Sequence, residues 1–204
     1  MKHPKEEKTF LMIKPDGVKR GLSGEIILRI EKVGLKIIGL KMFKPEEDKV
    51  DNHYPKNEEW VRRLGERTKE TYRKYGYNMK EEHDTEDVLE MGREVRKWLI
   101  NFMTSGPVII MAIKGIHAVE MTRKLVGDTI PSKAELGTIR GDFSIDSPIS
   151  ANRDHRAIYN IVHASETEEE AAHEFQHWFG DSEAVWDYQR SDEMVMFPET
   201  KEKK

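Results

Sequence analysis

The amino-acid sequence predicts an α+β fold in which helices cover one antiparallel sheet. Four short apolar segments are each bounded by glycine, proline or polar residues, which is typical of strands. The segments between them carry apolar residues at helical spacing. With 204 residues, the chain has the length of one ordinary domain with a hydrophobic core of its own. We therefore expect a single domain over residues 1–204.

The N-terminal part of the chain predicts a strand, a helix and a second strand. The apolar run TFLMIK at 9–14 ends at the turn sequence PDG, which favours a strand that enters a loop. A helix then runs from its N-cap, Ser23, to about Val33, because apolar residues recur there every three or four positions. After Gly34, the run LKIIGLKMF predicts the second strand, and its Gly39 indicates a bulge or a close backbone approach.

The C-terminal part predicts two further strands, each followed by a helix. Pro107 opens the third strand, VIIMAIK, and residues 116–126 form the next helix. The apolar stretch AIYNIVHAS predicts the fourth strand, and TEEEAAHEFQHWF predicts the helix of a C-terminal extension. The order of the first six elements is βαββαβ, with a four-stranded antiparallel sheet. That order is typical of a ferredoxin-like fold.

Two segments lie outside this order. Residues 55–95 are rich in lysine, arginine and glutamate and too polar for a core, so we expect a mostly helical surface insertion. Its basic residues could bind an anion, but a solvated face is the simpler interpretation. Residues 198–204, PETKEKK, are expected to form a flexible tail.

The composition restricts the classes of function. The net charge of -4 gives no overall attraction to nucleic acid or to an anionic membrane, so any phosphate site has to be local. With no cysteine, disulfides, thiolate catalysis and cysteine zinc sites are excluded. No apolar run reaches the roughly 20 residues that span a bilayer. The N-terminal MKHPKEEK also lacks the apolar core of a signal peptide, so we expect a cytoplasmic protein without a membrane partner.

One stretch, HEFQHWFG at 173–180, raises the question of a zinc enzyme. In the HExxH pattern, two histidines one helical turn apart bind zinc and the glutamate activates a water. On a helix, however, Phe175 and Trp178 share an apolar face, while His173 and His177 point to the opposite side. This placement disfavours a shared zinc ion, because zinc ligands converge in a cleft with a third ligand. A zinc-dependent hydrolase that uses His173 and His177 is kept as an alternative function.

Cationic residues beside turns and loops indicate a phosphate site. Lys14 stands at a strand end beside a rigid turn, a position suited to holding phosphates. The loop GDTIPSKAELGTIRGDF at 127–143 contains Thr129 and Arg140, and loops of this length inside a compact domain are usually functional. Arg123 lies on the preceding helix. Each arginine alone is equally well explained by a surface ion pair, but two arginines and a lysine together favour a triphosphate.

His163 lies in NIVHASE, at the end of the last predicted strand and just before a helix. A lone histidine at such a place is more often structural. Here Ser165 or Thr167 can cap the following helix, and Glu174 on that helix can point back toward the strand end. A histidine whose tautomer and orientation are set by an acidic partner is a competent nucleophile.

Four motifs carry a resemblance to a known family. TFLMIKPDGVKRGLSGEII, SGP at 105–107, GTIRGDF and NIVHASE resemble, in this order, the motifs of the nucleoside diphosphate kinases. The resemblance implies a ferredoxin-like fold and assembly into hexamers or tetramers. It also implies transfer of the γ-phosphate of a nucleoside triphosphate to a nucleoside diphosphate, by a ping-pong mechanism through a phosphohistidine, with Mg²⁺ and little base specificity. No specific nucleic acid partner is implied.

The family's functional residues can be carried over by position in the motifs. His163 resembles the phosphorylated nucleophile and Glu174 the acidic residue that orients it. For the base clamp, counting without gaps from SGP reaches Val95 and Leu99, and Trp98 is a candidate substitute. No protein ligand to the metal is implied, because the nucleotide phosphates hold Mg²⁺. The other implied positions are the catalytic Lys14 and Tyr54 and the nucleotide-binding Lys14, Arg123, Thr129, Arg140 and Asn160.

The chain departs from the family pattern at several places, among them Glu135 and Leu136, where the family typically has lysine and proline before GTIRGDF. The family usually has aspartate after HxS, where this chain has Glu166, whose longer side chain can alter the cap of the last helix. The extra residues SIDSPISANRDHRA at 144–157 leave one side of the base clamp without an assigned residue. A non-catalytic nucleotide-binding scaffold is a further alternative, but the complete set of matched polar residues favours the kinase.

Overall fold

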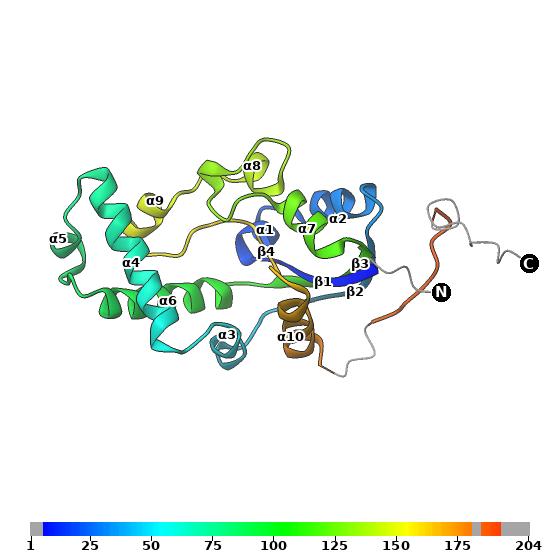
Figure 1. Cartoon of the computed structure of the whole chain (residues 1–204), viewed down its shortest axis with the longest axis horizontal. Coiled ribbons are helices and arrows are strands. Elements are labelled where there is room, and N and C mark those ends of the chain that lie inside the picture. Colours follow the sequence, from blue (N-terminus) through cyan, green and yellow to red (C-terminus); the bar gives the residue numbers. More distant parts are fainter. Residues whose placement is uncertain (1–5, 181–184, 193–204) are drawn as a thin grey trace, which may run out of the picture.

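The structure is a computed structural model that describes residues 6–180 and 185–192. The flexible tail expected at 198–204 lies outside these described residues. Four strands form one antiparallel sheet in the order β2-β3-β1-β4 (Figure 1). The strands are β1 (Glu6–Ile13), β2 (Lys36–Phe43), β3 (Val108–Ile116) and β4 (Val162–Ala164). The predicted α+β fold with a four-stranded antiparallel sheet is confirmed.

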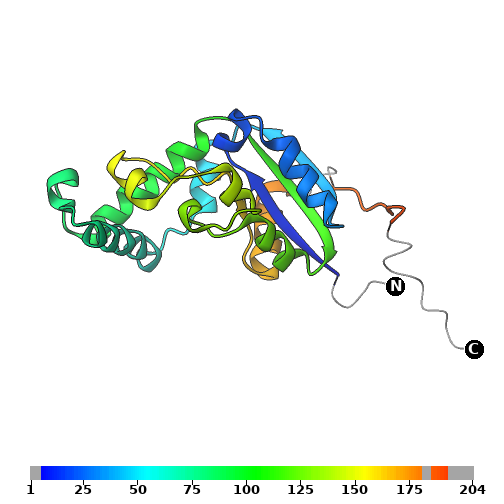
Figure 2. The ribbon, with the colours of Figure 1, turned by 90° about the horizontal axis from the view of Figure 1, so that it is seen from above.

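Helices surround this sheet and extend to one side of it (Figure 2). They are α1 (Pro15–Lys19), α2 (Ser23–Lys32), α3 (Glu47–His53), α4 (Glu58–Tyr75), α5 (Met79–His83), α6 (Val88–Thr104), α7 (Ala118–Val126), α8 (Ile139–Phe143), α9 (Pro148–Arg153), α10 (Glu168–Phe179) and a 3-10 turn (Pro131–Lys133). No helix in the described part of the chain is both long enough and apolar enough to cross a membrane.

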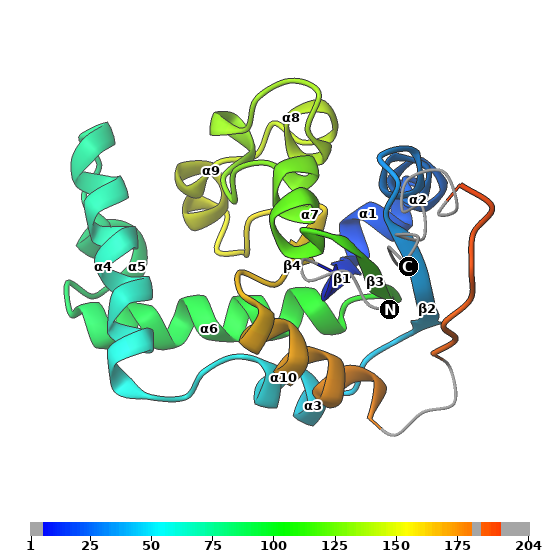
Figure 3. The ribbon, with the colours of Figure 1, turned by 45° about the vertical axis from the view of Figure 1, so that its right-hand side comes forward.

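The alternation of side chains along β1 explains why the sheet has two hydrophobic cores. Leu11 and Ile13 point to one face, where they pack with residues of α2 and α7. Phe10 and Met12 point to the other face, where they pack with residues of α3, α6 and α10. Figure 3 shows α3 and α10 on one side of the strands and α7 on the other. Because both faces of β1 are buried, its sequence is a continuous apolar run.

Two strands have local irregularities. The register of β2 shifts next to Gly39, as this glycine predicted. The strand β4 is shorter than the predicted AIYNIVHAS, because Ile161 just before it has a φ of 70°, which interrupts the extended backbone. Arg140 also takes up the carbonyl groups of Asn160 and Val162, which leaves them unavailable to a further strand.

The insertion is helical, and it is continuous with the core. The helices α4 and α5 lie within 55–95, but α6 begins at Val88 inside that range and continues to Thr104. Its first part buries Met91 in a cluster with α4 and α5, and its last part buries Phe102 in the sheet core. The expected end of the insertion therefore falls inside an unbroken helix, which runs from the sheet to α4 in Figure 1.

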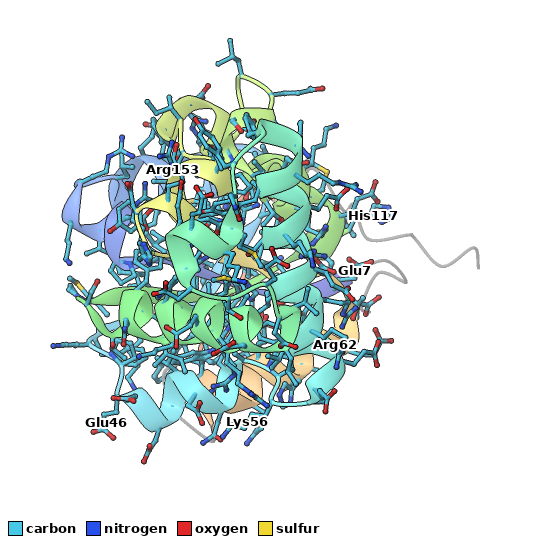
Figure 4. All side chains as sticks on the ribbon, turned by 90° about the vertical axis from the view of Figure 1, so that its left-hand side faces the viewer. Glu7, Glu46, Lys56, Arg62, His117 and Arg153 are labelled. Atoms are coloured by element: carbon cyan, nitrogen blue, oxygen red, sulfur yellow. The ribbon has the colours of Figure 1, made fainter. Side chains whose placement is uncertain are left out.

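The extra residues at 144–157 pack against the insertion. Their α9 carries Arg153, which forms a salt bridge of 3.2 Å with Glu82. The ring of His155 lies 4.6 Å from that of His83, measured between centroids. Arg153 is labelled in Figure 4, on the side of the molecule where α9 meets the insertion. The two segments outside the ferredoxin-like order thus stabilise one another.

The helices α4 and α6 cross with their backbones in contact. Gly65 of α4 and Gly92 of α6 lie at the crossing. A Cβ atom added at Gly65 would lie 1.7 Å from the carbonyl oxygen of Val88, and one added at Gly92 would lie 2.0 Å from that of Val61. Such distances are far inside van der Waals contact, so any side chain at either position would force the helices apart.

We expect Gly65→Ala to lower the free energy of unfolding by about 1–3 kcal/mol, because the methyl group overpacks the crossing. Gly24→Ala in α2 is the matched control, since no atom lies within 4 Å of the added Cβ there. Alanine is the better helix former, so the control should be neutral or stabilising by less than about 1 kcal/mol. Urea unfolding measures both variants, and equal effects would contradict the close crossing.

Candidate active site

A cleft of about 290 Å³ lies where β1 ends beside the short strand β4, next to the C-terminal end of α7. It brings together side chains that are far apart in the sequence. The predicted site residues that line it are Lys14, Arg123, Thr129, Arg140, Asn160 and His163. The remaining lining residues are Val126, Gly127, Asp128, Ala164, Glu166 and Glu170.

His163 on β4 is hydrogen-bonded to Glu174 on α10. Nε2 of His163 and Oε1 of Glu174 are 2.5 Å apart. Because a carboxylate only accepts hydrogen bonds, Nε2 carries the proton and Nδ1 keeps the free lone pair. The side chain of His163 is 25 % exposed, whereas that of Glu174 is 4 % exposed. The imidazole therefore lines the cleft with a nucleophilic nitrogen, while its partner is shielded from water.

Opposing effects act on the pKa of Glu174. Burial raises the pKa of this carboxyl, but the hydrogen bond and charge of His163 and the hydrogen bond from Ser165 outweigh it and hold the pKa below its usual value. Glu174 is therefore an anion at neutral pH. A buried anion at Nε2 stabilises the positive charge that the imidazole acquires when Nδ1 reacts.

Ser165 and Thr167 have different roles at the start of α10. Both were predicted as candidate caps of this helix. The Thr167 hydroxyl accepts a hydrogen bond from the backbone N–H of Glu170 at 3.1 Å and is the cap. Ser165 is fully buried and donates its hydroxyl to Oε2 of Glu174 at 2.5 Å. Ser165 therefore orients the carboxylate, a role that the sequence did not reveal.

His53, at the end of α3, lies beside this pair and was missed by the sequence reasoning. Its ring stands edge-on to that of His163, with the centroids 5.1 Å apart. Its Nδ1 lies 3.7 Å from Oε1 of Glu174 and accepts a hydrogen bond from the Trp178 indole at 3.3 Å. Burial, and then the neighbouring His163, lower the pKa of His53 to about 3, so this ring is neutral. The only sign in the sequence that His53 lies near the site was its position directly before Tyr54, a predicted site residue.

Lys14 and Asn160 form a buried polar pair in the cleft. Nζ of Lys14 donates to Oδ1 of Asn160 at 2.7 Å, and Nδ2 of Asn160 donates to the Thr129 carbonyl at 2.9 Å. Burial, and then the charge of Arg140, lower the pKa of Lys14 to about 8. The cleft thus holds a lysine whose charge is costly until an anion arrives.

Arg140 connects the loop at 127 with β4. Its guanidinium donates to the carbonyls of Gly127 at 2.8 Å, Asn160 at 3.1 Å and Val162 at 2.8 Å. Burial lowers the pKa of Arg140 to about 10, which still leaves it charged at neutral pH. Arg140 therefore holds the cleft together in addition to lining it.

The backbone beside His163 is strained. Ile161 has a φ of 70°, in the left-handed region that β-branched residues avoid. Its N–H donates to Oδ2 of Asp16 at 3.0 Å, and its carbonyl accepts from the N–H of Lys14 at 2.8 Å. These two bonds offset a strain of about 1–3 kcal/mol. They also fix Asn160 and His163 relative to the turn after β1.

Arg123 and Glu166 face each other at the rim of the cleft. Nη1 of Arg123 and Oε1 of Glu166 are 3.4 Å apart; the Arg123 side chain is half-exposed and that of Glu166 largely exposed. A surface ion pair of this kind contributes little to stability. Arg123 is therefore free to turn toward a ligand, and Glu166, which replaces the family's usual aspartate, does not close the cleft.

Besides the buried Glu174, three predicted site residues do not line the cleft. Tyr54 stacks on Trp60 with ring centroids 6.0 Å apart, and burial raises the pKa of its hydroxyl. Val95 packs in the apolar cluster of the insertion together with Trp98. Leu99 packs against the sheet core. Because α6 directs Val95 and Leu99 into apolar clusters, gapless counting along this helix does not reach the cleft.

The HEFQH stretch does not form the arrangement that a zinc hydrolase requires. His173 is exposed, and its ring centroid lies 6.4 Å from that of His177. A ring nitrogen of His177, Nε2, is already bonded to the Lys49 carbonyl at 2.9 Å. Glu174 points to His163 instead of toward a metal held by these two histidines.

The family model described as nucleoside diphosphate kinase matches residues 7–62 and 80–184. The chain belongs to the nucleoside diphosphate kinase family. The predicted family and enzyme class, a phosphotransferase, are therefore confirmed. The matched residues include the whole lining of the cleft. Residues 63–79, which the family model omits, lie in the helical insertion.

Relatives within this family resemble nearly the whole chain. The nucleoside diphosphate kinase of Pyrobaculum aerophilum is 47 % identical over 179 residues, which is 88 % of this chain and 98 % of that protein. A solved structure of an NDP kinase from this organism has a TM-score of 0.84 at 45 % identity and covers 89 % of this chain and 100 % of its own. A second solved structure is a transition state mimic of the nucleoside-diphosphate kinase from Borrelia burgdorferi with bound vanadate and ADP. It has a TM-score of 0.74 at 34 % identity and covers 95 % of this chain and 98 % of its own chain.

We expect Arg140→Lys to lower the free energy of unfolding by about 2–4 kcal/mol, because lysine cannot donate to three carbonyls at once and leaves buried acceptors unpaired. Arg123→Lys is the matched control and should change stability by less than about 0.5 kcal/mol, since Arg123 is half-exposed at the rim. Urea unfolding compares the two. Equal stability of both variants would contradict the bracing role of Arg140.

Nucleotide affinity is expected to fall as the pH rises above 8. An anion bound at Lys14 raises the pKa of this lysine from about 8, so binding takes up a proton at higher pH, and affinity falls by up to about tenfold per pH unit. Below pH 8 Lys14 is already charged, and its contribution is constant. Calorimetry in buffers of different ionisation enthalpy measures the proton uptake. Lys14→Gln should bind more weakly and without this proton uptake; uptake that persists in the variant would refute the assignment.

Proposed function

We propose that the protein transfers the γ-phosphate of a nucleoside triphosphate to a nucleoside diphosphate by a ping-pong mechanism, with His163 as the phosphorylated intermediate. The observation that carries the proposal is the hydrogen bond of 2.5 Å between Nε2 of His163 and the buried Glu174, at the wall of a cleft that Lys14, Arg123 and Arg140 also line. This bond leaves the lone pair on Nδ1, which is the nitrogen that attacks phosphorus.

The phosphates of the nucleotide bind to the cationic residues of the cleft. Lys14, Arg123 and Arg140 all line it, although the chain as a whole is acidic. Lys14 is held in place by Asn160, so little side-chain freedom is lost when a phosphate binds. Lys14 and Asn160 also serve the ribose hydroxyls, and Thr129 serves the phosphates. Because recognition is through phosphate and sugar, the base contributes little to specificity.

In the first half-reaction, the Nδ1 lone pair attacks the γ-phosphorus in line with the leaving oxygen. The Nδ1–P bond forms, the bond from phosphorus to the bridging oxygen breaks, and the nucleoside diphosphate leaves with that electron pair. The imidazole becomes a cation, which the Glu174 carboxylate stabilises at Nε2. In the second half-reaction, a terminal oxygen of another nucleoside diphosphate attacks the same phosphorus and regenerates neutral His163.

Divalent metal fits this site through the nucleotide. Asp128, Glu166 and Glu170 bring carboxylate oxygens to the cleft, and oxygen is the ligand that Mg²⁺ prefers. These side chains would contact the water shell of an ion that the β- and γ-phosphates hold. When bound, Mg²⁺ neutralises part of the charge on those phosphates. The cations of the chain hold the remaining oxygens in line with Nδ1.

Assembly into a hexamer or tetramer and a cytoplasmic location stay predictions. Self-association is supported by large apolar side chains that are exposed in the described part of the chain. Leu136 is 87 % exposed, Ile145 96 % and Met42 57 %. Contacts between copies of the chain would remove such side chains from water.

A labelling experiment tests the proposed mechanism. The purified protein, mixed with γ-labelled ATP and Mg²⁺ without an acceptor, is expected to take up label that is acid-labile and alkali-stable. The label should be absent from His163→Ala and should leave the wild-type protein when a nucleoside diphosphate is added. If nucleotide binds but no label appears, the chain is a non-catalytic nucleotide-binding scaffold and the proposal fails.

A further inference from the structure

Three side chains that can ligate a metal lie close together in the structure, and the proposed nucleophile, His163, is one of them. One ligand atom each from His53, His163 and Glu174 lies within 4.8 Å of the other two. Within residues 6–180 and 185–192, this is the one group of three such side chains that meets this distance. Two imidazole nitrogens and a carboxylate oxygen form a donor set that zinc sites with an open fourth position commonly use.

Two of the distances between these atoms can be compared with those of a tetrahedral site. Ligands about 2.0–2.1 Å from zinc stand about 3.4 Å apart in a tetrahedron. Nδ1 of His53 lies 3.7 Å from Oε1 of Glu174, which needs almost no change. Nε2 of His163 lies 2.5 Å from the same oxygen and has to move outward by about 1 Å. His163 has room for such a movement, since it lines the cleft and is partly exposed.

Two of the three ligand atoms already have a lone pair that a metal could take. Nδ1 of His53 accepts a hydrogen bond from the Trp178 indole, so it carries a lone pair and no proton. That bond is long, at 3.3 Å, and is the contact that a metal would displace. Oε2 of Glu174 is occupied by the Ser165 hydroxyl, which leaves Oε1 for the metal and holds the carboxylate in place.

We propose that His53, Glu174 and Nε2 of His163 bind Zn²⁺, and that this binding inhibits phosphoryl transfer. A neutral imidazole has one lone pair. If zinc takes the lone pair at Nε2, the proton of His163 resides on Nδ1, the nitrogen that has to attack phosphorus. One proton leaves Nε2 and one is taken up from water at Nδ1, so the step is neutral in protons. The inhibitory part rests on the proposed function; the zinc site itself does not.

The site explains which part of the HEFQH stretch meets a metal. Glu174 is the glutamate of that stretch, but its partners are His53 and His163 from other elements. His177 is held by the Lys49 carbonyl, and His173 is exposed on the far side of the helix. Mg²⁺ does not compete for this site, because it prefers six oxygen ligands and two of the three donors are nitrogens.

Metal binding is tested without nucleotide by titration with Co²⁺ and Zn²⁺. Co²⁺ in a tetrahedral site absorbs visible light and reports on occupancy, whereas Zn²⁺ is spectroscopically silent and displaces it. The wild-type protein is expected to bind one Co²⁺ that Zn²⁺ displaces. His53→Asn should weaken this binding at least about tenfold, while its amide oxygen still accepts the Trp178 hydrogen bond.

His173→Ala is the matched control, because it removes a histidine of the HEFQH stretch that lies outside the proposed site. This variant is expected to bind Co²⁺ as the wild type does. If His173→Ala loses the absorption and His53→Asn keeps it, the metal is on the helix surface and the proposal is overturned. The absence of a tetrahedral spectrum from the wild-type protein overturns it as well, whether or not His53→Asn folds.

Inhibition is tested on protein that was loaded with Zn²⁺ and then desalted, so that zinc bound to nucleotide does not interfere. Uptake of label from γ-labelled ATP and Mg²⁺ should fall at least about tenfold and return when a zinc chelator is added. His53→Asn is loaded with Zn²⁺ and desalted in the same way. Its uptake of label should fall far less, relative to the uptake that this variant shows without zinc. Tetrahedral binding without inhibition overturns the inhibitory role. Failure of the zinc-free wild-type protein to take up label refutes the proposed function and leaves the zinc site intact.

Discussion

The geometry of the cleft depends on the hydrogen bonds that the guanidinium of Arg140 donates to the backbone. The guanidinium donates to three carbonyls, one from the loop after α7 and two around β4, and so ties a loop to an edge strand that is only three residues long. A strand this short has few backbone bonds of its own to hold His163 in position. Because the arginine is buried and satisfied by backbone oxygens, it supplies positive charge and rigidity at the same place.

The cleft stores unfavourable interactions that a polyanion can relieve. Burial lowers the pKa of both Lys14 and Arg140, and the charge of Arg140 lowers the pKa of Lys14 further. Ile161 keeps a backbone conformation that is costly for its side chain. The two cores on either side of β1 hold these residues in place. The site is therefore organised before a ligand arrives, which is what electrostatic catalysis of phosphoryl transfer requires.

Burial and hydrogen bonding decide how His53, His163, His173 and His177 can act. His163 is partly exposed and has one nitrogen bonded to a buried anion, so its other nitrogen can react. His53 is buried and neutral, and its lone pair points into the same cluster. His173 and His177 look like zinc ligands in sequence, yet one is exposed and the other is bonded to a carbonyl. The same residue type thus has three roles, and its surroundings select among them.

The sequence by itself determined the order of the strands and of the main helices and half of the lining of the cleft, because hydrophobic periodicity and motif spacing are local properties. Only the tertiary structure decided that His53 and Ser165 surround Glu174, that Arg140 braces β4, and that Val95 and Leu99 face apolar clusters. These contacts depend on how separate elements cross and on their register. The His53–Trp178 bond, for example, joins residues 125 positions apart, a relation that local periodicity does not encode.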